Sequence, residues 1–291
     1  MDYSSLDYVI STAKERNISI SQLMLESRAR ELGRPIDELY DEMSTKLQVM
    51  EEGIHRRTQM PFISPSGLSG GDAYRLNNAF IRGLTIGGRV LDKMLIKAFA
   101  CAEGNACMDE IAALPAACSC GIIPAVLLTL MEEHDIPRDK IVMGLFTAAG
   151  IGMVIAKRVS MSGTQSGCQA ECGSASTMAA GAAVEVLGGT PEMIGNACSI
   201  ALKNVLGLIC DPVANLSEIP CIKRNASGVA NALVAANLAL TGIGSQIPVD
   251  EVIDAMKQVG DFMAPALRGM AEAGLSDTPT GLQIKSKYAN L

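Results

Sequence analysis

Three of the nine cysteines in this chain stand in settings that suit a metal centre. Cys168, Cys210 and Cys221 each lie beside, or next but one to, a Gly or Pro, where one helix would end or another begin. Three thiolates can hold an iron–sulfur cluster and leave one iron without a protein ligand, and such an iron can act as a Lewis acid on a substrate. Because these cysteines do not form the C-x2-C-x2-C run of bacterial ferredoxins, inert buried thiols are the alternative.

The remaining cysteines give weaker signals. Cys198 lies in an apolar helical run and is expected to pack as a small hydrophobic residue. Cys118 and Cys120 form a Cys-x-Cys pair, which is either an added metal or redox site or two small buried residues.

The elements around the three cysteines are predicted to be helices. The run from 170 to 187 is rich in Ala, Gly and Ser, and Cys168 would lie at its N-terminal end. Free N–H groups and the positive end of the helix dipole there stabilise a thiolate. The next helix is expected to run from 191 to about 209, with Cys210 at its exit and Cys221 in the loop beyond.

Three polar residues follow Cys221 at the expected start of another helix, from about 224 to 240. Lys223, Arg224 and Asn225 could bind a substrate carboxylate, and Arg is the better bidentate clamp. A solvated helix start, or charge compensation for the cluster, is the alternative interpretation of the two cations.

Helical periodicity is found throughout the chain, and no stretch shows a convincing β alternation, so we expect an all-α fold. Residues 1–60 carry amphipathic patterns, with Pro35 at a first helical position. They predict an N-terminal helical region packed on a helical catalytic domain of residues 61–291, unless the two form one continuous domain. Beyond residue 75 the helices are rich in small residues, which predicts that they form the buried centre.

A segment rich in Gly, Ser and Pro, residues 61–72, joins the two parts. Its glycines supply backbone freedom and free N–H groups, the material of an anion-binding nest. Ser66, Gly67, Ser69 and Gly70 are therefore candidate substrate-binding residues, and a plain linker is the alternative.

Composition narrows the class of protein. Of 291 residues 48% are hydrophobic but only 3% aromatic, so the core must be built from Ala and aliphatic residues. A net charge of −7 without basic blocks gives no support to nucleic-acid binding, and the apolar run 122–131 is too short to span a bilayer. An odd number of irregularly spaced cysteines, and a polar, acidic start unlike a signal peptide, predict a reducing, cytoplasmic location.

Three long stretches carry a resemblance to a known family: SPSGLSGGDA (64–73), SGTQSGCQAECGSASTMAA (162–180) and ALKNVLGLICDPVANLSEIPCIKRNA (201–226). Over essentially its whole length the chain resembles the α chain of iron–sulfur-dependent L-serine dehydratase. The resemblance implies that Cys168, Cys210 and Cys221 hold a [4Fe-4S] cluster. Cys172 is the leading substitute if one of the three does not.

The resemblance also implies the reaction. L-Serine would lose water to give aminoacrylate, which becomes pyruvate and ammonia. No stretch resembles the lysine motif of pyridoxal phosphate enzymes, so no pyridoxal phosphate is expected. The implied catalytic residues are Lys223, Asn225 and Ser119, and the implied substrate-binding residues are Ser66, Gly67, Ser69, Gly70, Ser162, Gly163, Thr164 and Arg224.

The source of the proton acceptor is a gap in the sequence. The only histidines, His55 and His134, lie in charged segments that are expected to be exposed helix ends. In the two-chain members of the family a separate β chain contributes a histidine-containing loop. The resemblance therefore implies an obligatory β-chain partner besides the substrate L-serine.

One segment departs from the family pattern. Where the family usually reads Ala-Thr-Pro-Thr-Ala-Gly-Ser, this chain has Ala-Leu-Pro-Ala-Ala-Cys-Ser from Ala113 to Ser119. A threonine hydroxyl is thus lost at Ala116 and a glycine at Cys118, which leaves the exact substrate open. Two alternatives remain: a lyase or desulfhydrase acting on L-threonine or L-cysteine, and a non-catalytic cluster-binding redox sensor.

Overall fold

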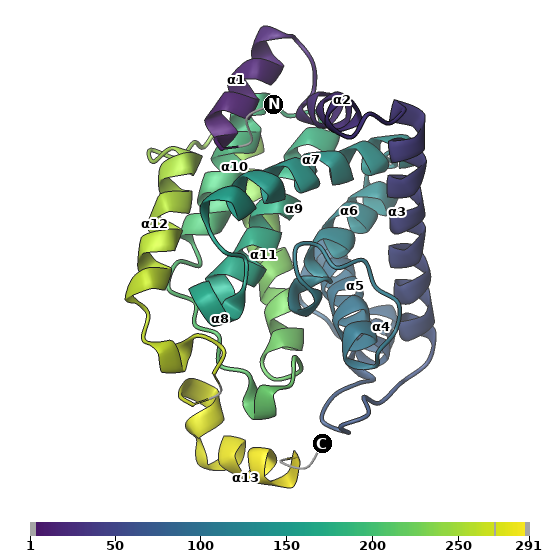
Figure 1. Ribbon diagram of the computed structural model, residues 1–291. Helices are drawn as coiled ribbons and strands as arrows, with labels where there is room; N and C mark the ends of the chain where they lie inside the picture. Colours follow the sequence, from purple (N-terminus) through teal and green to yellow (C-terminus); the bar gives the residue numbers. More distant parts are fainter. Residues whose placement is uncertain (1–3, 271, 289–291) are drawn as a thin grey trace.

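The computed structural model describes residues 4–270 and 272–288, and within them the predicted all-α fold is confirmed (Figure 1). The first three residues of the polar start lie outside this part of the chain. The α-helices are α1 (Leu6–Glu15), α2 (Ile20–Leu32), α3 (Ile36–Gln59), α4 (Asp72–Ile81), α5 (Gly88–Ala106), α6 (Ile122–Glu133), α7 (Arg138–Arg158), α8 (Gly163–Ser166), α9 (Ser174–Val186), α10 (Pro191–Lys203), α11 (Cys221–Leu240), α12 (Val249–Phe262) and α13 (Pro279–Tyr288). The 3-10 turns are η1 (Ala117–Ser119), η3 (Val213–Asn215), η4 (Pro265–Leu267) and η5 (Gly274–Asp277), and η2 (Gln169–Gly173) is a π-helical turn.

The first three helices cover one end and one side of the molecule (Figure 1). The Ser5 hydroxyl accepts from the Tyr8 N–H and caps α1. Pro35 was predicted to be the first residue of a helix, but α3 begins one residue later, at Ile36. The Glu185 carboxylate of α9 accepts from the N–H of Ile20 at 3.0 Å, which offsets the positive end of the α2 dipole. The division of the chain at residue 60 stays a prediction.

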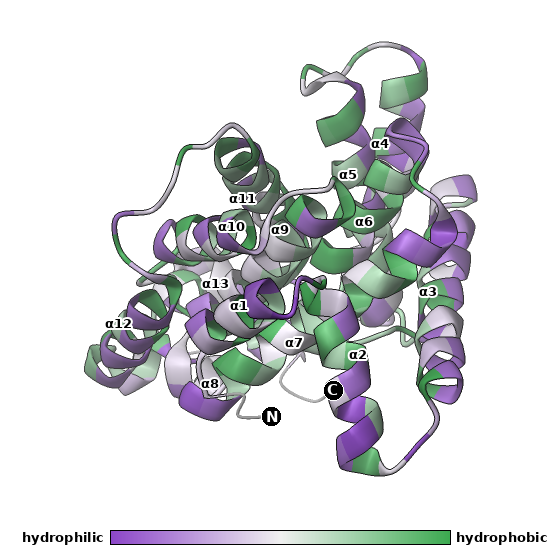
Figure 2. Ribbon diagram, turned by 90° about the horizontal axis from the view of Figure 1, so that it is seen from above, coloured by the Kyte–Doolittle hydropathy of each residue, from purple (hydrophilic) through white to green (hydrophobic). Residues whose placement is uncertain are grey.

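The centre of the fold is α9, which packs against α6, α7, α10 and α11. Its residues are small and almost all buried, as predicted from composition. A Cβ on Gly181 would lie 2.4 Å from Ile151 of α7, and one on Gly228 of α11 would lie 2.4 Å from Ile122 of α6. These two glycines therefore let the helix backbones approach closely. In Figure 2 hydrophobic residues dominate α6, whereas α3 and α12 also carry many hydrophilic residues.

Helix α7 is the one helix within the described residues that is long and apolar enough to cross a membrane by length and composition. In the fold, 67% of its most apolar window is buried inside the protein. It packs against α2 and α9, as a core helix does.

Three helix boundaries near the cysteines differ from the predictions. Helix α9 starts at Ser174 and not at residue 170, and the π-helical turn η2 lies between Cys168 and this helix. Helix α10 ends at Lys203 and not near Ile209, because Asn204 caps it and Gly207 takes a left-handed φ of 85°. Helix α11 starts at Cys221, three residues earlier than predicted, so Cys221 is its first residue and does not lie in a loop. Cys210 consequently lies in an extended stretch, where it forms an isolated β-bridge with Arg268.

Candidate metal centre

The three cysteines singled out from the sequence come together in the fold. Cys168 lies between α8 and η2, Cys210 in the bridge to Arg268, and Cys221 at the first position of α11. All three are buried, and each thiol interacts electrostatically with the other two. Segments of the chain that span 53 positions (from 168 to 221) thus bring these three thiols into one region.

The side chains gathered in this region are mainly thiols. Within residues 4–270 and 272–288, no three His, Cys, Asp or Glu side chains are gathered closely enough to hold one metal ion. Three buried thiols suit the sulfur chemistry of an iron–sulfur cluster. The Glu171 carboxylate is the oxygen-bearing group beside them, and it interacts with the Cys210 and Cys221 thiols. A Cβ on Gly163 would lie only 2.8 Å from the Cys210 Sγ, so the glycine keeps this side of the thiols clear.

Cys168 is the thiol that ionises most readily. The Cys172 thiol, whose Sγ lies 3.4 Å from that of Cys168, and the Arg224 guanidinium lower the pKa of Cys168 despite its burial. The same contact with Cys168, together with burial, raises the pKa of Cys172 well above its usual value. The two thiols are therefore hydrogen-bonded to each other in this structure, and the role of Cys172 as a substitute ligand stays a prediction.

The other two thiols are held protonated at neutral pH. Burial, followed by the charges of Glu171 and Cys168, raises the pKa of Cys210 to about 12. Burial and then the charge of Cys168 raise the pKa of Cys221 to about 12 as well. Binding a cation would reverse this, because a metal-bound thiol is deprotonated. The three thiols would therefore release protons when they bind a cluster.

Arg224 is fixed beside the cysteines by partners within the chain. One Nη donates to the Ile209 carbonyl at 2.8 Å, and the other pairs at 2.7 Å with Asp211, a side chain that is almost fully buried. Because both terminal nitrogens have partners, the guanidinium serves here as a fixed positive charge next to Cys168. This placement favours charge compensation for the thiolates, and a further role in binding a substrate carboxylate stays a prediction.

The three predicted catalytic residues lie in different settings. Lys223 is exposed, and its ammonium lies 3.7 Å from the Asp72 carboxylate. Asn225 is fully buried, and its amide bonds three main-chain groups: it donates to the Cys221 and Cys118 carbonyls and accepts from the Gly121 N–H. Ser119 is also fully buried. Of these three side chains only Lys223 is open to a substrate, and the catalytic roles remain predictions.

The Ser/Gly-rich loop reaches the same region through an acidic residue that the sequence analysis did not single out. The Ser64 and Ser66 hydroxyls each donate to the Glu218 carboxylate at 2.7 Å, and the Ser69 hydroxyl donates to it as well. Glu218 stands three residues before Cys221. The loop predicted to bind an anion therefore binds a carboxylate of its own chain beside the cysteines.

Glycines of this loop have conformational reasons for their presence. Gly70 has a φ of 119°, and a Cβ there would lie 2.1 Å from the Phe62 carbonyl oxygen. Gly67 has a φ of 74° in the turn between the serines. The loop ends at Asp72, whose N–H donates at 2.7 Å to the buried Glu103 carboxylate. Burial raises the pKa of Glu103.

A second predicted segment, Ser162 to Thr164, lies at the start of α8. Its two hydroxyls form a 2.7 Å hydrogen bond with each other. The Gly163 N–H donates to the Glu171 carboxylate at 3.1 Å, and Glu171 also interacts with the thiols of Cys210 and Cys118. Segment and cysteines are therefore neighbours, and substrate binding by these residues stays a prediction.

Four acidic residues lie around the cysteines and the Ser/Gly-rich loop, and none of them was singled out from the sequence: Glu103, Glu171, Asp211 and Glu218. Glu171 and Asp211 stand next to or near the motif cysteines, which is a local signal. Glu103 and Glu218 meet their loop partners across 31 and at least 149 positions of the chain, and no local pattern reveals such contacts.

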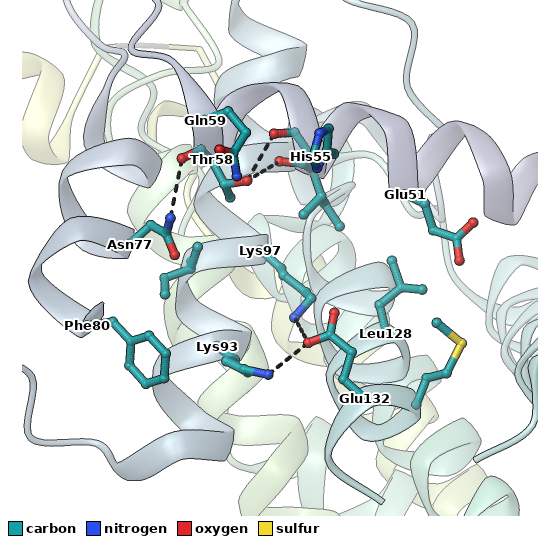
Figure 3. A pocket seen from close by; sticks show the side chains of 13 residues that line it. Glu51, His55, Thr58, Gln59, Asn77, Phe80, Lys93, Lys97, Leu128 and Glu132 are labelled. Atoms are coloured by element: carbon teal, nitrogen blue, oxygen red, sulfur yellow. Dashed lines mark hydrogen bonds and ion pairs between the residues drawn. The ribbon is translucent and has the colours of Figure 1, made fainter. Parts of the chain in front are cut away.

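A cavity of about 420 Å³ lies elsewhere, between α3, α4, α5 and α6 (Figure 3). Figure 3 shows Lys93 and Lys97 pointing toward Glu132, with His55 and Asn77 on other parts of the wall. Its size is that of a ligand pocket. It contains none of the residues predicted from the sequence to form the site.

Comparisons with known proteins agree with the resemblance seen in the sequence. The family described as "Serine dehydratase alpha chain" matches residues 15–276. A relative from Bacillus subtilis, "Probable L-serine dehydratase, alpha chain", is 43% identical over 98% of this chain and 95% of its own length. The "L-serine dehydratase, alpha chain" of Peptoniphilus asaccharolyticus is 41% identical over 96% of each chain.

Some relatives are longer than this chain. The "L-serine dehydratase" of Streptomyces coelicolor is 37% identical over 93% of this chain but only 60% of its own length. For "L-serine dehydratase TdcG" of Escherichia coli the identity is 33%, over 94% of this chain and 62% of that protein. This chain therefore matches only part of the length of these two relatives.

Proposed function

We propose, because this chain belongs to the serine dehydratase alpha chain family, that it is the cluster-binding chain of a two-chain L-serine dehydratase. The complete enzyme would remove water from L-serine and release pyruvate and ammonia. The observation that carries the proposal is the convergence of the buried thiols of Cys168, Cys210 and Cys221 around one point beside Arg224.

The reaction needs a base for a weakly acidic proton and help for a poor leaving group. The Cα–H bond breaks, its electron pair forms the Cα–Cβ double bond, and hydroxide leaves from Cβ with a proton as water. Tautomerisation of the aminoacrylate to an imine and hydrolysis then give pyruvate and ammonia. A [4Fe-4S] cluster on the three cysteines would supply a Lewis acid for the departing hydroxyl.

Residues of this chain would prepare and orient the substrate. Arg224, fixed by Asp211, offsets the negative charge of the thiolates. Lys223, exposed beside Cys221, would attract the serine carboxylate to the opening of the site. The Ser66 and Ser69 hydroxyls, which here donate to Glu218, are suited to a carboxylate acceptor, and the substrate would have to compete with Glu218 for them.

The base is proposed to come from a β chain. His55 lies on the wall of the separate cavity and His134 caps the end of α6, so neither belongs to the cysteine region. The matching family and the relatives from Bacillus subtilis and Peptoniphilus asaccharolyticus are named as alpha chains, which supports a separate partner chain. All nine cysteines are free thiols, which supports the proposed cytoplasmic location.

The test is anaerobic co-purification with a β chain, followed by iron and sulfide analysis and a pyruvate assay. We expect about four irons per chain, loss of iron and activity in Cys168→Ser, Cys210→Ser and Cys221→Ser, and no loss in the Cys198→Ser control. His55→Ala and His134→Ala should change the rate by less than about tenfold, since an essential base is worth roughly 10²–10⁴. Full iron occupancy in Cys210→Ser would overturn the ligand assignment. Release of 2-oxobutyrate from threonine or sulfide from cysteine, without pyruvate from serine, would favour the related lyases.

A further inference from the structure

The Cys-x-Cys pair at 118 and 120 is divided by the fold. Cys120 is buried, and its thiol points to the Cys101 carbonyl at an Sγ–O distance of 3.6 Å. Cys118, two residues earlier on η1, faces the other way and interacts with Glu171, Cys221 and Cys168. The pair is therefore not a chelating unit, and only Cys118 belongs to the cysteine region.

The main chain around Cys118 is fixed to the helix that carries Cys221. The Asn225 Nδ2 donates to the Cys118 carbonyl at 2.7 Å and to the Cys221 carbonyl at 2.9 Å, so one amide group joins the two residues. Asn225 also accepts from the N–H of Gly121 at 2.9 Å. A Cβ on Gly121 would lie 2.5 Å from the Ala98 carbonyl oxygen, so α5 closes the other side of this turn.

The turn also packs against η2, which directly follows Cys168. Cys118 is thus held between the segments of two of the three expected ligands. Burial, followed by the negative charges of Glu171, Cys221 and Cys168, raises the pKa of Cys118, which agrees with a thiol that shares their space. Thiols from four separate segments consequently lie in one region.

Four thiolates are the ordinary ligand set of a [4Fe-4S] cluster. We propose that Cys118 supplies a fourth thiolate to the cluster that Cys168, Cys210 and Cys221 would hold, and that the substrate must displace this thiolate to reach iron. The inference rests on the proposed function, and it gives a role to the one cysteine that replaces the family's usual glycine.

The exchange involves no oxidation or reduction. When Cys118 binds, its S–H bond breaks, the sulfur donates an electron pair to iron and the proton goes to water. When the substrate enters, a lone pair of a substrate oxygen would take that position, and the released Cys118 thiolate would take a proton back from water. The Cys118 thiolate and the substrate oxygen would therefore each protect the same iron from loss while bound to it.

The test compares the anaerobically reconstituted full-length chain with Cys118→Gly and Cys118→Ser, and with Cys120→Ser as the matched control. The first readout is the rate at which ferricyanide removes one iron, followed by the electron paramagnetic resonance signal of the three-iron product. We expect this rate to rise by roughly tenfold or more in both Cys118 variants, the size of effect seen when support of a metal site is lost. Cys120→Ser should behave as the wild type.

The second readout is alkylation of Cys118 by iodoacetamide, located by mass spectrometry. The Cys118 thiol should be protected in the loaded wild type and should become reactive when L-serine is added. Equal rates of iron loss in the wild type and Cys118→Gly, with Cys118 alkylated in the loaded protein, would overturn the inference and leave the proposed function intact. A wild-type chain that takes up no iron and sulfide would instead overturn the proposed cofactor, and this inference with it.

Discussion

The Nδ2 atom of Asn225 lies 2.7 Å from the carbonyl oxygen of Cys118, a residue 107 positions earlier in the chain. The contact is fully buried on the Asn225 side, and the same amide also serves the first turn of α11. A residue predicted to contact substrate is therefore the structural link between two cysteine-bearing segments. Asn225 therefore holds the segments of Cys118 and Cys221 in place relative to each other.

The first prediction follows from this link. Asn225→Ala would leave two carbonyls and one N–H without their partner, and we expect the free energy of unfolding to fall by about 3 kcal/mol. Asn225→Asp, which keeps an acceptor for Gly121 but loses both donated bonds, should fall by a comparable amount. Urea denaturation of the metal-free chain measures the effect. An Asn225→Ala protein as stable as the wild type would show that water replaces the amide.

The second prediction concerns the Ser/Gly-rich loop. Glu218→Gln removes the charge that accepts from the Ser64, Ser66 and Ser69 hydroxyls, and charged acceptors give the stronger hydrogen bonds. We expect a loss of about 2 kcal/mol in stability and faster amide hydrogen exchange over residues 64–70. Ser217→Ala, at the exposed neighbouring position, is the control and should leave exchange unchanged. Unaltered exchange in Glu218→Gln would mean that the loop is held by its own turns.

Local sequence signals foresaw the helices well because each signal acts within a few residues. Thr190 caps α10 through its hydroxyl and Pro191 follows at the first position, as the Thr-Pro pair predicts. The small residues of α9 likewise predicted its burial. The predicted end of α10 was wrong, because Asp211-Pro212 was expected to stop the helix, whereas it already ends at Lys203, ahead of the left-handed Gly207.

The sequence drew attention to the cysteines of this region and not to the acidic residues around them. Cys168, Cys210 and Cys221 carry distinctive flanking residues, so their convergence could be predicted from sequence patterns and family resemblance. Glu218 and Glu103 give no such signal, since each is one acidic residue whose partner is chosen by tertiary packing. The different directions of Cys118 and Cys120 also depend on a turn that only the packing of α5, η2 and α11 defines.

The third prediction tests the space beside Cys210. Gly163→Ala would bring a Cβ to 2.8 Å from both the Cys210 Sγ and a Glu171 carboxylate oxygen, so one of these groups must move. We expect iron uptake during anaerobic reconstitution to weaken by roughly tenfold, as when the groups that support metal ligands are disturbed. Gly53→Ala in α3 is the control, because nothing lies within 4 Å of its new Cβ, and it should gain up to about 1 kcal/mol. Unchanged iron uptake in Gly163→Ala would contradict the position given to Cys210.

The last prediction uses the two lysines that share Glu132 in the cavity of Figure 3. Burial lowers the pKa of Lys97 from 10.5, since its single carboxylate partner does not offset desolvation. Lys93 is also desolvated, but its bonds to Glu133 and Glu132 outweigh this and raise its pKa. The two residues should therefore affect stability with opposite signs.

Lys97 binds fewer protons in the folded than in the unfolded chain, so it costs stability at neutral pH and the cost disappears as pH rises toward 10.5. Lys97→Met keeps the apolar stem and should raise the free energy of unfolding by about 1 kcal/mol at pH 7, with less gain at pH 10. Lys93 stabilises the fold below pH 10.5, and this contribution is lost as the pH rises through the raised pKa of the folded state. The matched variant Lys93→Met should therefore be less stable than the wild type at pH 7. Denaturant titrations at the two pH values measure both effects. If Lys97→Met lost as much stability as Lys93→Met at pH 7, the Lys97–Glu132 pair would outweigh burial and the sign argued here would be wrong.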